Sequence, residues 1–289
     1  MANHDQLHRF LFEHLDLRGE LVQMETSWQT VLKQHDYPEA VRTVLGQTMA
    51  ATLIMSATIK FDGSLIIQAQ SSGPITTLVS QATSERTVRG LAHWEGEVAD
   101  TNLAATFGDG QLVITVDGSK TERYQGIVAL EGANIAEALQ NYFSASEQLE
   151  SRFWLFANGE RAAGLFLQQL PSEQEQNDDW ERITALADTI TEDELLNLST
   201  SELLHRLFHE EEVRLFEAEP VSFRCSCSRK KIESSLLAMG KQEADDIIKE
   251  QGGIHVDCDF CNQHYQFDKF DTEQLFSSAT LMESPQRVQ

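Results

Sequence analysis

Cys225-Ser-Cys227 and, thirty residues later, Cys258-Asp-Phe-Cys261 contain all four cysteines of this 289-residue chain. Cysteines placed by chance would be spread along the sequence, whereas these four lie in its last quarter. A Cys-x-x-Cys turn presents two sulfurs to one metal ion, and soft thiolates hold zinc tetrahedrally at roughly 2.3 Å. The spacing therefore predicts a zinc site made by Cys225, Cys227, Cys258 and Cys261, on which the fold of the C-terminal part depends.

The same two pairs are close enough along the chain to form disulfides. A disulfide needs Cα atoms about 4.4 to 6.8 Å apart, a separation that i,i+2 and i,i+3 neighbours reach in bent backbone. The Cys225–Cys227 spacing is one residue tighter than in an ordinary zinc ribbon, so this loop has fewer ways to relax around an ion. A purely structural zinc site and a site that alternates between metal and disulfides both fit the spacing.

Charged neighbours differ between the two halves of this site. Four cations surround the first pair: Arg224, Arg229, Lys230 and Lys231. Nearby cations favour the thiolate, which is both the metal ligand and the species that oxidants attack, whereas Asp257 and Asp259 beside Cys258 act in the opposite direction. We therefore expect the halves to differ in reactivity. His255 and His264 lie three residues from a cysteine, but four thiolates already complete a tetrahedron.

Composition narrows the compartment and the partners. The formal net charge is −24 and the isoelectric point is near 4.6, which argues against nucleic acid as a partner, because phosphate binding needs clustered Lys and Arg. No run of eighteen apolar residues and no apolar N-terminal segment occurs, so we expect a cytoplasmic protein without a membrane partner. In a reducing compartment, clustered cysteines favour metal binding or redox sensing over permanent disulfides.

Residues 1–171 predict an α+β core domain with a mainly antiparallel sheet. Helices are expected at residues 4–14, 38–58 and 135–148, with Pro38 in the first turn of the second. Strands are expected at residues 64–70, 75–80, 88–98, 111–117, 124–130, 152–157 and 164–170. The connections are too short for crossover helices, so the strands should pair antiparallel. Residues 18–21, Arg-Gly-Glu-Leu, are interpreted as a turn.

No catalytic motif occurs in the sequence. Gly-x-Ser-x-Gly, a phosphate-binding Gly-x-x-x-x-Gly-Lys and His-Glu-x-x-His are all absent, so we expect no enzyme activity. A thiol oxidoreductase would place Cys-x-x-Cys at the start of a helix in a βαβ unit. Residues 258–261 lie instead between two strand-like stretches, which disfavours that class.

Residues 172–220 predict an acidic, helical linker. Residues 171–220 contain fifteen Asp and Glu against three Arg and no Lys, a net charge of −12 and half that of the whole chain. Two apolar helical faces nevertheless stand out: Trp180, Ile183, Leu186, Ala187 and Ile190 form the first, and Leu203, Leu204, Leu207 and Phe208 form the second. Because the acidic faces repel one another, these helices should depend on a neighbour for stability. An ordinary pair of surface helices is the alternative.

Residues 221–289 form a small domain with too few apolar residues for a self-sufficient core. A bound metal supplies the missing free energy, because metal binding and folding are one process in small zinc modules. We expect the linker to pack on this domain. Oxidation of the sulfurs would then release zinc, unfold the small domain and remove the support of the linker.

Matching stretches occur in one order along almost the whole chain. They are His4–Phe12, Arg18–Leu21, Tyr124–Gly132, Phe208–Val213, Cys225-Ser-Cys227-Ser and the segment His-Val-Asp-Cys-Asp-Phe-Cys-Asn-Gln-His-Tyr-Gln-Phe at 255–267. Together they resemble the 33-kDa heat-shock chaperone family, the bacterial HslO proteins. All four ligand positions of the family pattern are present at Cys225, Cys227, Cys258 and Cys261.

This resemblance implies a redox-regulated holdase that works without ATP. It implies that the reduced protein is inactive and binds one Zn²⁺ per chain through the four cysteines. It further implies that oxidants convert the ligands into the disulfides Cys225–Cys227 and Cys258–Cys261, with release of zinc and unfolding of the linker. The oxidised homodimer would then bind unfolding client proteins. A structural zinc-ribbon adaptor without redox switching is the alternative that the residues themselves leave open.

Overall fold

The computed structural model describes residues 4–118, 123–146, 149–171 and 178–283. Two compact units divide the chain, Met1–Arg224 and Cys225–Gln289. The first unit contains the predicted core together with the acidic segment, and the second contains the four cysteines. Within the described ranges, no helix is both long and apolar enough to cross a membrane. The predicted boundaries of a core domain at 1–171, a linker at 172–220 and a C-terminal domain at 221–289 remain predictions.

Sheet A joins the N-terminal strands to strands from much later in the chain. Its order is β10-β1-β2-β9-β8, with β11 also paired to β1, and these pairings are antiparallel. The strands are β1 (Gln6–Phe12), β2 (Leu17–Met24), β8 (Ser151–Ala157), β9 (Ala162–Gln169), β10 (Val213–Leu215) and β11 (Glu219–Pro220). The acidic segment therefore contributes two short strands to the core sheet.

Sheet B has the order β12-β5-β4-β3-β6-β7. Its strands are β3 (Gly63–Gln70), β4 (Ile75–Thr83), β5 (Thr87–Trp94), β6 (Gln111–Gly118), β7 (Tyr124–Ala129) and β12 (Ser222–Phe223). The pairings are antiparallel except the two-residue contact of β12 with β5. The predicted α+β class with mainly antiparallel strands is thus confirmed, although the strands form two sheets.

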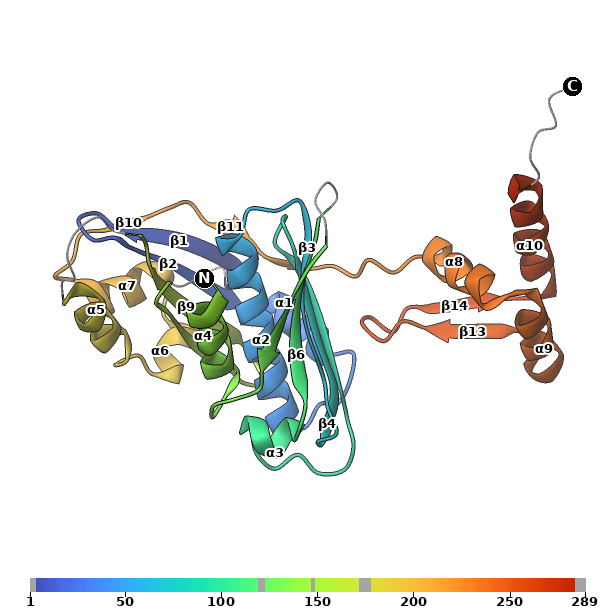
Figure 1. The fold of residues 1–289 in the computed structure, drawn as a ribbon, viewed down its shortest axis with the longest axis horizontal. Helices are drawn as coiled ribbons and strands as arrows, with labels where there is room; N and C mark the ends of the chain where they lie inside the picture. Colours follow the sequence, from blue (N-terminus) through green and yellow to red (C-terminus); the bar gives the residue numbers. More distant parts are fainter. Residues whose placement is uncertain (1–3, 119–122, 147–148, 172–177, 284–289) are drawn as a thin grey trace, which may run out of the picture. The chain divides into compact units, whose positions relative to one another are not determined.

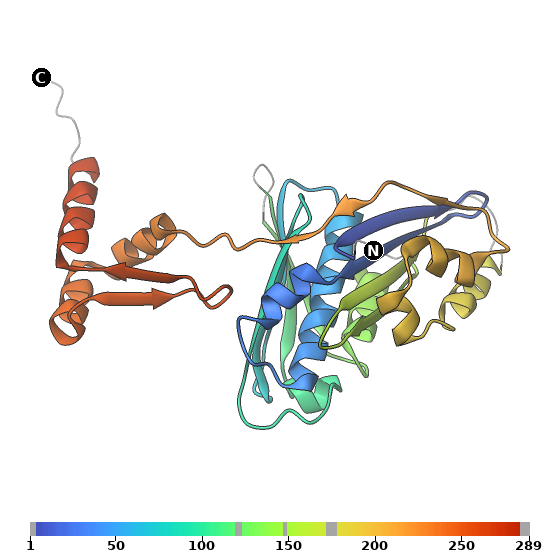
Figure 2. The same cartoon turned by 180° about the vertical axis from the view of Figure 1, so that it is seen from behind.

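Helix α2 (Glu39–Thr58) lies between the two sheets (Figures 1 and 2). It is buried on almost every side, which is expected of a helix that is apolar all round. Its buried hydroxyls, at Thr48, Thr52 and Ser56, donate to carbonyls one turn earlier, so this polarity is satisfied within the helix. Shorter helices complete the layer: α1 (Thr26–Leu32), α3 (Leu103–Phe107) and α4 (Ile135–Ser146). The helices predicted at 38–58 and 135–148 are confirmed, with 147–148 outside the described residues.

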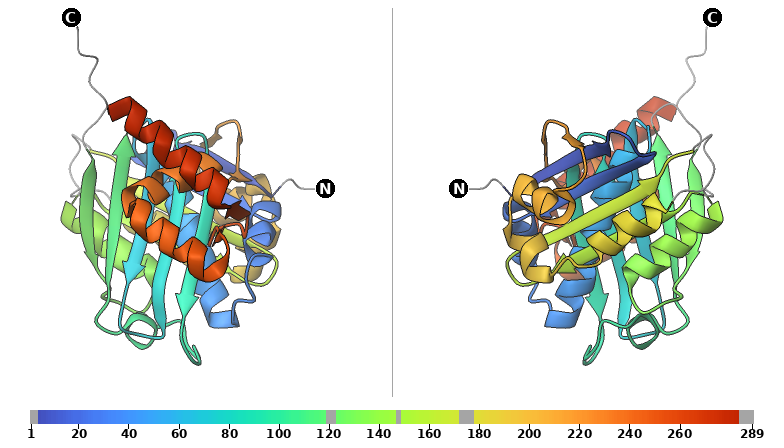
Figure 3. Two further views of the ribbon diagram at one scale, coloured as in Figure 1. Left: turned by 90° about the vertical axis from the view of Figure 1, so that its right-hand side faces the viewer. Right: turned by 90° about the vertical axis from the view of Figure 1, so that its left-hand side faces the viewer.

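Three acidic helices cover the face of sheet A that points away from α2 (Figures 1 and 3). They are α5 (Asp179–Ala187), α6 (Glu192–Asn197) and α7 (Thr200–Phe208). Their apolar faces meet sheet A, with Phe208 edge-on to Phe12 at a ring-centroid distance of 5.1 Å. The amphipathic helices are confirmed. The expectation that they pack on the C-terminal domain is wrong, because both apolar faces are used against the core sheet.

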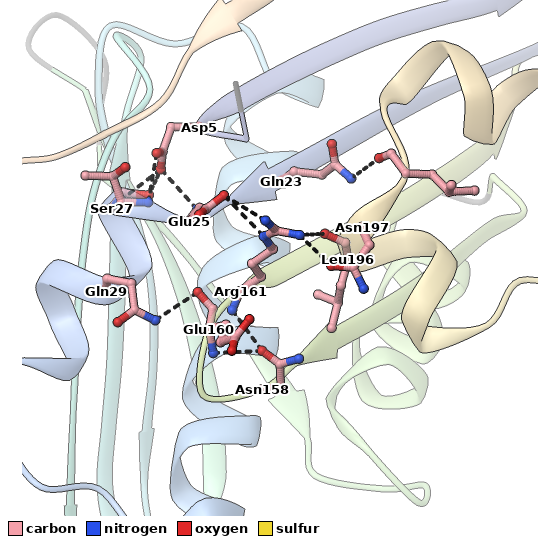
Figure 4. Close-up of polar contacts among 12 residues, drawn as sticks. Asp5, Gln23, Glu25, Ser27, Gln29, Asn158, Glu160, Arg161, Leu196 and Asn197 are labelled. Carbon is pink, nitrogen blue, oxygen red and sulfur yellow. Dashed lines mark hydrogen bonds and ion pairs between the residues drawn. The ribbon is translucent and has the colours of Figure 1, made fainter. Parts of the chain in front are cut away.

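Polar side chains of the core hold α6 in place (Figure 4). Gln23 Nε2 donates to two main-chain carbonyls at the end of this helix, 2.8 Å from each. Arg161 pairs with Glu25 at 3.1 Å and donates to Asn197 Oδ1 and to the carbonyl of Leu196. These contacts satisfy carbonyls that a helix C-terminus leaves without an intrahelical partner. The acidic segment is therefore bound to the core by polar ties as well as by its apolar faces.

Two predictions for the N-terminal segment are wrong. Residues 6–12 form strand β1 instead of a helix, and residues 18–21 lie inside strand β2 instead of a turn. Leu7 faces α2, whereas Phe10 and Phe12 face the acidic helices. Because both faces of the strand are buried, its apolar residues do not alternate strictly and their spacing resembles that of a helix. Gly19 pairs with Phe10 of the neighbouring strand, and the ring of Phe10 lies over it. Glycine is required at this position, because a Cβ would come within 2.1 Å of the ring.

A charged cluster lies where strands β1 and β11 of sheet A, the end of α2 and the turn between β4 and β5 meet. Arg86 has a positive φ of 59° and a side chain only 9% exposed. Its guanidinium donates to the carbonyl of Ser56 at 2.9 Å and to Glu219 at 2.9 Å. Arg9 pairs with the same carboxylate. The two arginines thus fix strand β11 against the core, and Arg86 also places a cation near the C-terminal end of α2.

Glu20 is buried beside this cluster, with 2% of its surface exposed. Its Oε2 has no hydrogen-bond partner among the described residues. Burial raises the pKa of Glu20 to about 7, although the positive charges of Arg18, Arg9 and Arg86 act to lower it. The folded protein therefore takes up a proton at this carboxyl in a pH range where the unfolded chain does not.

We predict that Gly19→Ala destabilises the core. The new methyl group would displace the ring of Phe10, and overpacking of this kind costs about 1–3 kcal/mol. Denaturant unfolding measures the change. Gly159→Ala is the control, because its Cβ would meet only Arg42 Nη1, at 3.8 Å. Equal stability of the two variants would contradict the close contact between Phe10 and Gly19.

A second prediction concerns pH. Because the pKa of Glu20 is raised from 4.5 to about 7 on folding, its protonated form stabilises the fold at low pH, and this stability is lost as pH rises through 7. Glu20→Gln does not titrate. Relative to wild type, its free energy of unfolding should increase by on the order of 2 kcal/mol between pH 5 and pH 8. Urea unfolding at both pH values tests this, and a constant difference would contradict it.

Candidate metal centre

The second unit is a small module built from three helices and one hairpin. They are α8 (Arg229–Met239), α9 (Lys241–Gln251), β13 (Ile254–Asp257), β14 (His264–Phe267) and α10 (Lys269–Glu283). Its buried apolar residues within the described range are Leu236, Ala244, Ile254 and Phe267. The other apolar side chains of this cluster are only partly buried. A core this sparse gives the module little stability of its own.

The second cysteine pair lies in the turn between β13 and β14. The Cys258 amide donates to the carbonyl of Gln263 at 3.1 Å and closes the hairpin. The amides of Cys261 and Asn262 both donate back to the carbonyl of Cys258, at 3.1 and 2.7 Å. Asn262 adopts the left-handed conformation, with φ 52°, which asparagine tolerates better than most residues. The turn thus directs two sulfurs to the same side.

The first cysteine pair lies in the irregular segment between β12 and α8. Helix α8 begins directly after it, with Ser228 as the N-cap residue whose hydroxyl accepts from the amide of Lys231. Serine is among the preferred residues at this position. The start of α8 therefore fixes the end of the segment that carries Cys225 and Cys227.

Arg229 connects the two halves of the site. Its guanidinium donates to the carbonyl of Gln266 at 2.8 Å, lies 4.1 Å from the centre of the Phe267 ring and pairs with Asp271 at 2.9 Å. These contacts join the start of α8 to strand β14 and to α10. The planar guanidinium suits this combination of stacking and hydrogen bonding better than a lysine would.

The four sulfurs come together as one cluster. All lie within 4.8 Å of one another, all four cysteines are of intermediate burial, and none of them forms a disulfide. Cys225 Sγ is 3.6 Å from Cys258 Sγ, and Cys227 Sγ is 3.4 Å from Cys261 Sγ. A tetrahedral ion with metal–sulfur bonds of 2.3 Å requires sulfurs about 3.8 Å apart. The donor set and its spacing therefore fit one tetrahedral metal ion.

The surroundings of Cys258 and Cys261 disfavour their thiolate forms. Burial is the main cause that raises the pKa of Cys258, and burial likewise raises the pKa of Cys261 well above its usual range. Neighbouring sulfurs add to the effect at Cys261. Tyr265 donates its hydroxyl to Cys227 Sγ at 3.2 Å, and this bond raises the pKa of Tyr265 to about 12. A metal ion would supply the positive charge that such a crowded set of thiolates needs.

Sequence reasoning identified the four cysteines but not the residues that support them. Tyr265 and Arg229 contact sulfur or join the two halves through pairings that only the hairpin register creates. Of the cations expected around the first pair, Lys231 donates to the hydroxyl of Ser226, the residue between Cys225 and Cys227, at 3.1 Å. His255 and His264 contact each other and lie outside the sulfur cluster.

Comparison with known proteins shows the family of this chain. Residues 5–268 match the family model described as Hsp33 protein. A relative from Nitrosococcus oceani named 33 kDa chaperonin is 59% identical over 277 residues, which cover 96% of each chain. The 33 kDa chaperonin of Pseudomonas aeruginosa is 48% identical over 287 residues, covering 96% of this chain and 97% of the relative. A crystal structure of the 33 kDa chaperonin of Thermotoga maritima has a TM-score of 0.83 and 26% identity, covering 96% of this chain and 99% of that one. These matches confirm the resemblance inferred from the sequence, and the chain belongs to the Hsp33 family.

Proposed function

We propose that the protein is a redox-regulated, ATP-independent holdase of the cytoplasm. In the reduced state it holds one Zn²⁺ through Cys225, Cys227, Cys258 and Cys261 and does not bind clients. Oxidation of these cysteines activates it. The observation that carries the proposal is the cluster of four cysteine sulfurs within 4.8 Å of one another, located in a module whose apolar core is too sparse to hold it together.

Zinc would contribute charge and geometry at this site. As a bound ion it would stabilise the thiolates of Cys258 and Cys261, which burial otherwise disfavours, and it would tie the segment before α8 to the β13–β14 turn. Tyr265 supports this arrangement by donating to Cys227 Sγ. Hydrogen bonds to ligand atoms commonly tune the affinity of metal sites.

Oxidation removes the ligands. Two equivalents of peroxide take four electrons from four thiolates, consume four protons and yield two disulfides and four waters. We assign the disulfides to Cys225–Cys227 and Cys258–Cys261, following the family resemblance. A disulfide sulfur carries no negative charge to hold a divalent cation, so the zinc is lost and the module unfolds.

The acidic helices link this event to client binding. They cover an apolar face of sheet A that includes Phe10, Phe12, Leu21, Leu165 and Leu167. The segment that follows them pairs with β1 and β5 and ends one residue before Cys225. Unfolding of the module would loosen this segment and then the helices. Both the helices and sheet A would then expose apolar surface, which binds unfolding proteins, and the oxidised chain would form a homodimer.

The first test measures zinc release, thiol loss and client protection in the same sample. Reduced, zinc-loaded protein is treated with peroxide under mild warming. We expect release of one zinc per chain, loss of four thiols and the ability to suppress light scattering by an aggregating client. Untreated reduced protein is the control and should not protect.

Two outcomes would oppose the proposal. Retained zinc after peroxide treatment, or zinc release without client protection, would favour a structural zinc-ribbon adaptor instead. Peptide mapping of the oxidised protein tests the disulfide assignment separately. Bonds between the two motifs would contradict the pairing within each motif.

The second test weakens the ties that hold α6. Arg161→Met removes the contacts to Glu25, Asn197 and Leu196, and we expect it to favour release of the helix by about 1 kcal/mol, a factor near five in the open population. Hydrogen exchange at the amides of α6 should become faster, and activation should need less oxidant. Arg89→Met on sheet B, where Arg89 bonds to Gln81, is the matched control. Unchanged exchange at α6 would contradict the role of Arg161.

A further inference from the structure

The outer face of the β13–β14 hairpin carries a polar cluster that the four-sulfur site does not use. In the antiparallel register, Asp257 lies opposite His264, and His255 lies two residues before Asp257 on the same face. The alternate residues of both strands face the core of the module. The pleat therefore brings His255, Asp257 and His264 together on the exposed side.

Two ring nitrogens of this cluster face each other. His255 Nδ1 lies 3.4 Å from His264 Nε2, and the rings are nearly parallel, with an interplanar angle of 23°. This separation is longer than a well-formed hydrogen bond. Two imidazole nitrogens bound at 2.0–2.1 Å to one tetrahedral ion lie about 3.4 Å apart. The two nitrogens are thus already spaced as ligands of a single ion.

A carboxylate orients one of the two rings. Asp257 Oδ1 lies 2.7 Å from His264 Nδ1, on the side of the ring opposite the nitrogen that faces His255. When neutral His264 donates its Nδ1 proton to Asp257, the lone pair on Nε2 is available to a metal. Such carboxylate–histidine pairs commonly support metal ligands in proteins.

We propose that His255 and His264, supported by Asp257, form a second metal site for a divalent ion that prefers imidazole, such as Ni²⁺, Cu²⁺ or Zn²⁺. Water would complete the coordination, because the side chains of His264 and Asp257 are 52% and 67% exposed. The site is open and exchangeable, unlike the four-sulfur cluster. This inference goes beyond the proposed function, since it requires a folded hairpin and no redox change.

A second histidine pair in the chain provides a matched control. His205 and His209 are four residues apart at the end of α7, and their ring centroids are 6.0 Å apart at an angle of 66°. In the described part of the chain, no carboxylate forms a hydrogen bond or ion pair with either ring. If any exposed histidine pair sufficed, this pair would bind as well as the hairpin pair.

The test uses full-length, reduced protein whose four cysteines are loaded with one zinc. Ni²⁺ is added as the probe, and calorimetry with metal analysis counts bound ions. We expect one additional Ni²⁺ per chain in wild type and in the double variant His205→Ala/His209→Ala. His255→Ala and His264→Ala should each remove this binding, and Asp257→Asn should weaken it 10- to 100-fold. A persistent zinc content of one per chain shows that each variant keeps a folded module.

A second measurement on wild-type protein does not depend on the variants. Added Zn²⁺ should shift the ¹⁵N resonances of Nδ1 in His255 and of Nε2 in His264, while the resonances of His205 and His209 stay in place. The proposal is overturned if zinc-loaded protein takes up no further ion, if binding survives His255→Ala, or if the shifts occur at the α7 pair. Zinc binding at the cysteines is counted separately, so failure here leaves the proposed switch unaffected.

Discussion

The four sulfurs of the C-terminal module must be held together by something other than an apolar core. Fully burying a large apolar side chain contributes roughly 1.5–3 kcal/mol, and the described part of the module buries only four apolar residues, one of them an alanine. Binding of zinc to small modules is worth about 10–16 kcal/mol. On that comparison the ion would be the largest stabilising contribution to the module. In the proposed switch, the same dependence would let oxidation of the sulfurs remove this contribution in one step.

The acidic segment shows why a helix can be folded and still easy to release. Its helices have local stabilisation from capping boxes at Thr191 and Ser199 and from the Arg206–Glu194 pair. These are exposed contacts of modest value, whereas the apolar stripes depend entirely on sheet A. If the helices separate from sheet A, they are only six to nine residues long, which is too short for an isolated helix to be stable in water. The negative charge of the segment then opposes aggregation of the exposed surface.

Sequence patterns predicted the elements whose stability is local and missed those that distant residues create. Helix α2 and the hairpin strands of sheet B followed from periodicity and turn residues. Strands β1 and β2 were misread because both of their faces are buried and Gly19 accommodates a ring from the neighbouring strand. Helix α1 was missed because no side chain at its own N-cap position caps it: Asp5 accepts from the amides of Thr26 and Ser27. At the metal site, cysteine spacing identified the sulfurs, but Tyr265 meets Cys227 only in the folded hairpin.

In the proposed switch, coupling between the module and the acidic helices would depend on the segment that joins them. Strands β10, β11 and β12 pair over only three, two and two residues, so each is weak by itself. Their attachment is reinforced at one point, where Arg9 and Arg86 hold Glu219. The amide of Arg224 donates to the carbonyl of Val88 immediately before the first cysteine. In this order along the chain, unfolding that begins at Cys225 would first separate β12 from β5. It would then have to break the ion pairs of Glu219, which are the strongest attachment of the segment. Under that proposal, the ion pairs at Glu219 would determine whether unfolding of the module stays local or spreads to the helices that cover sheet A.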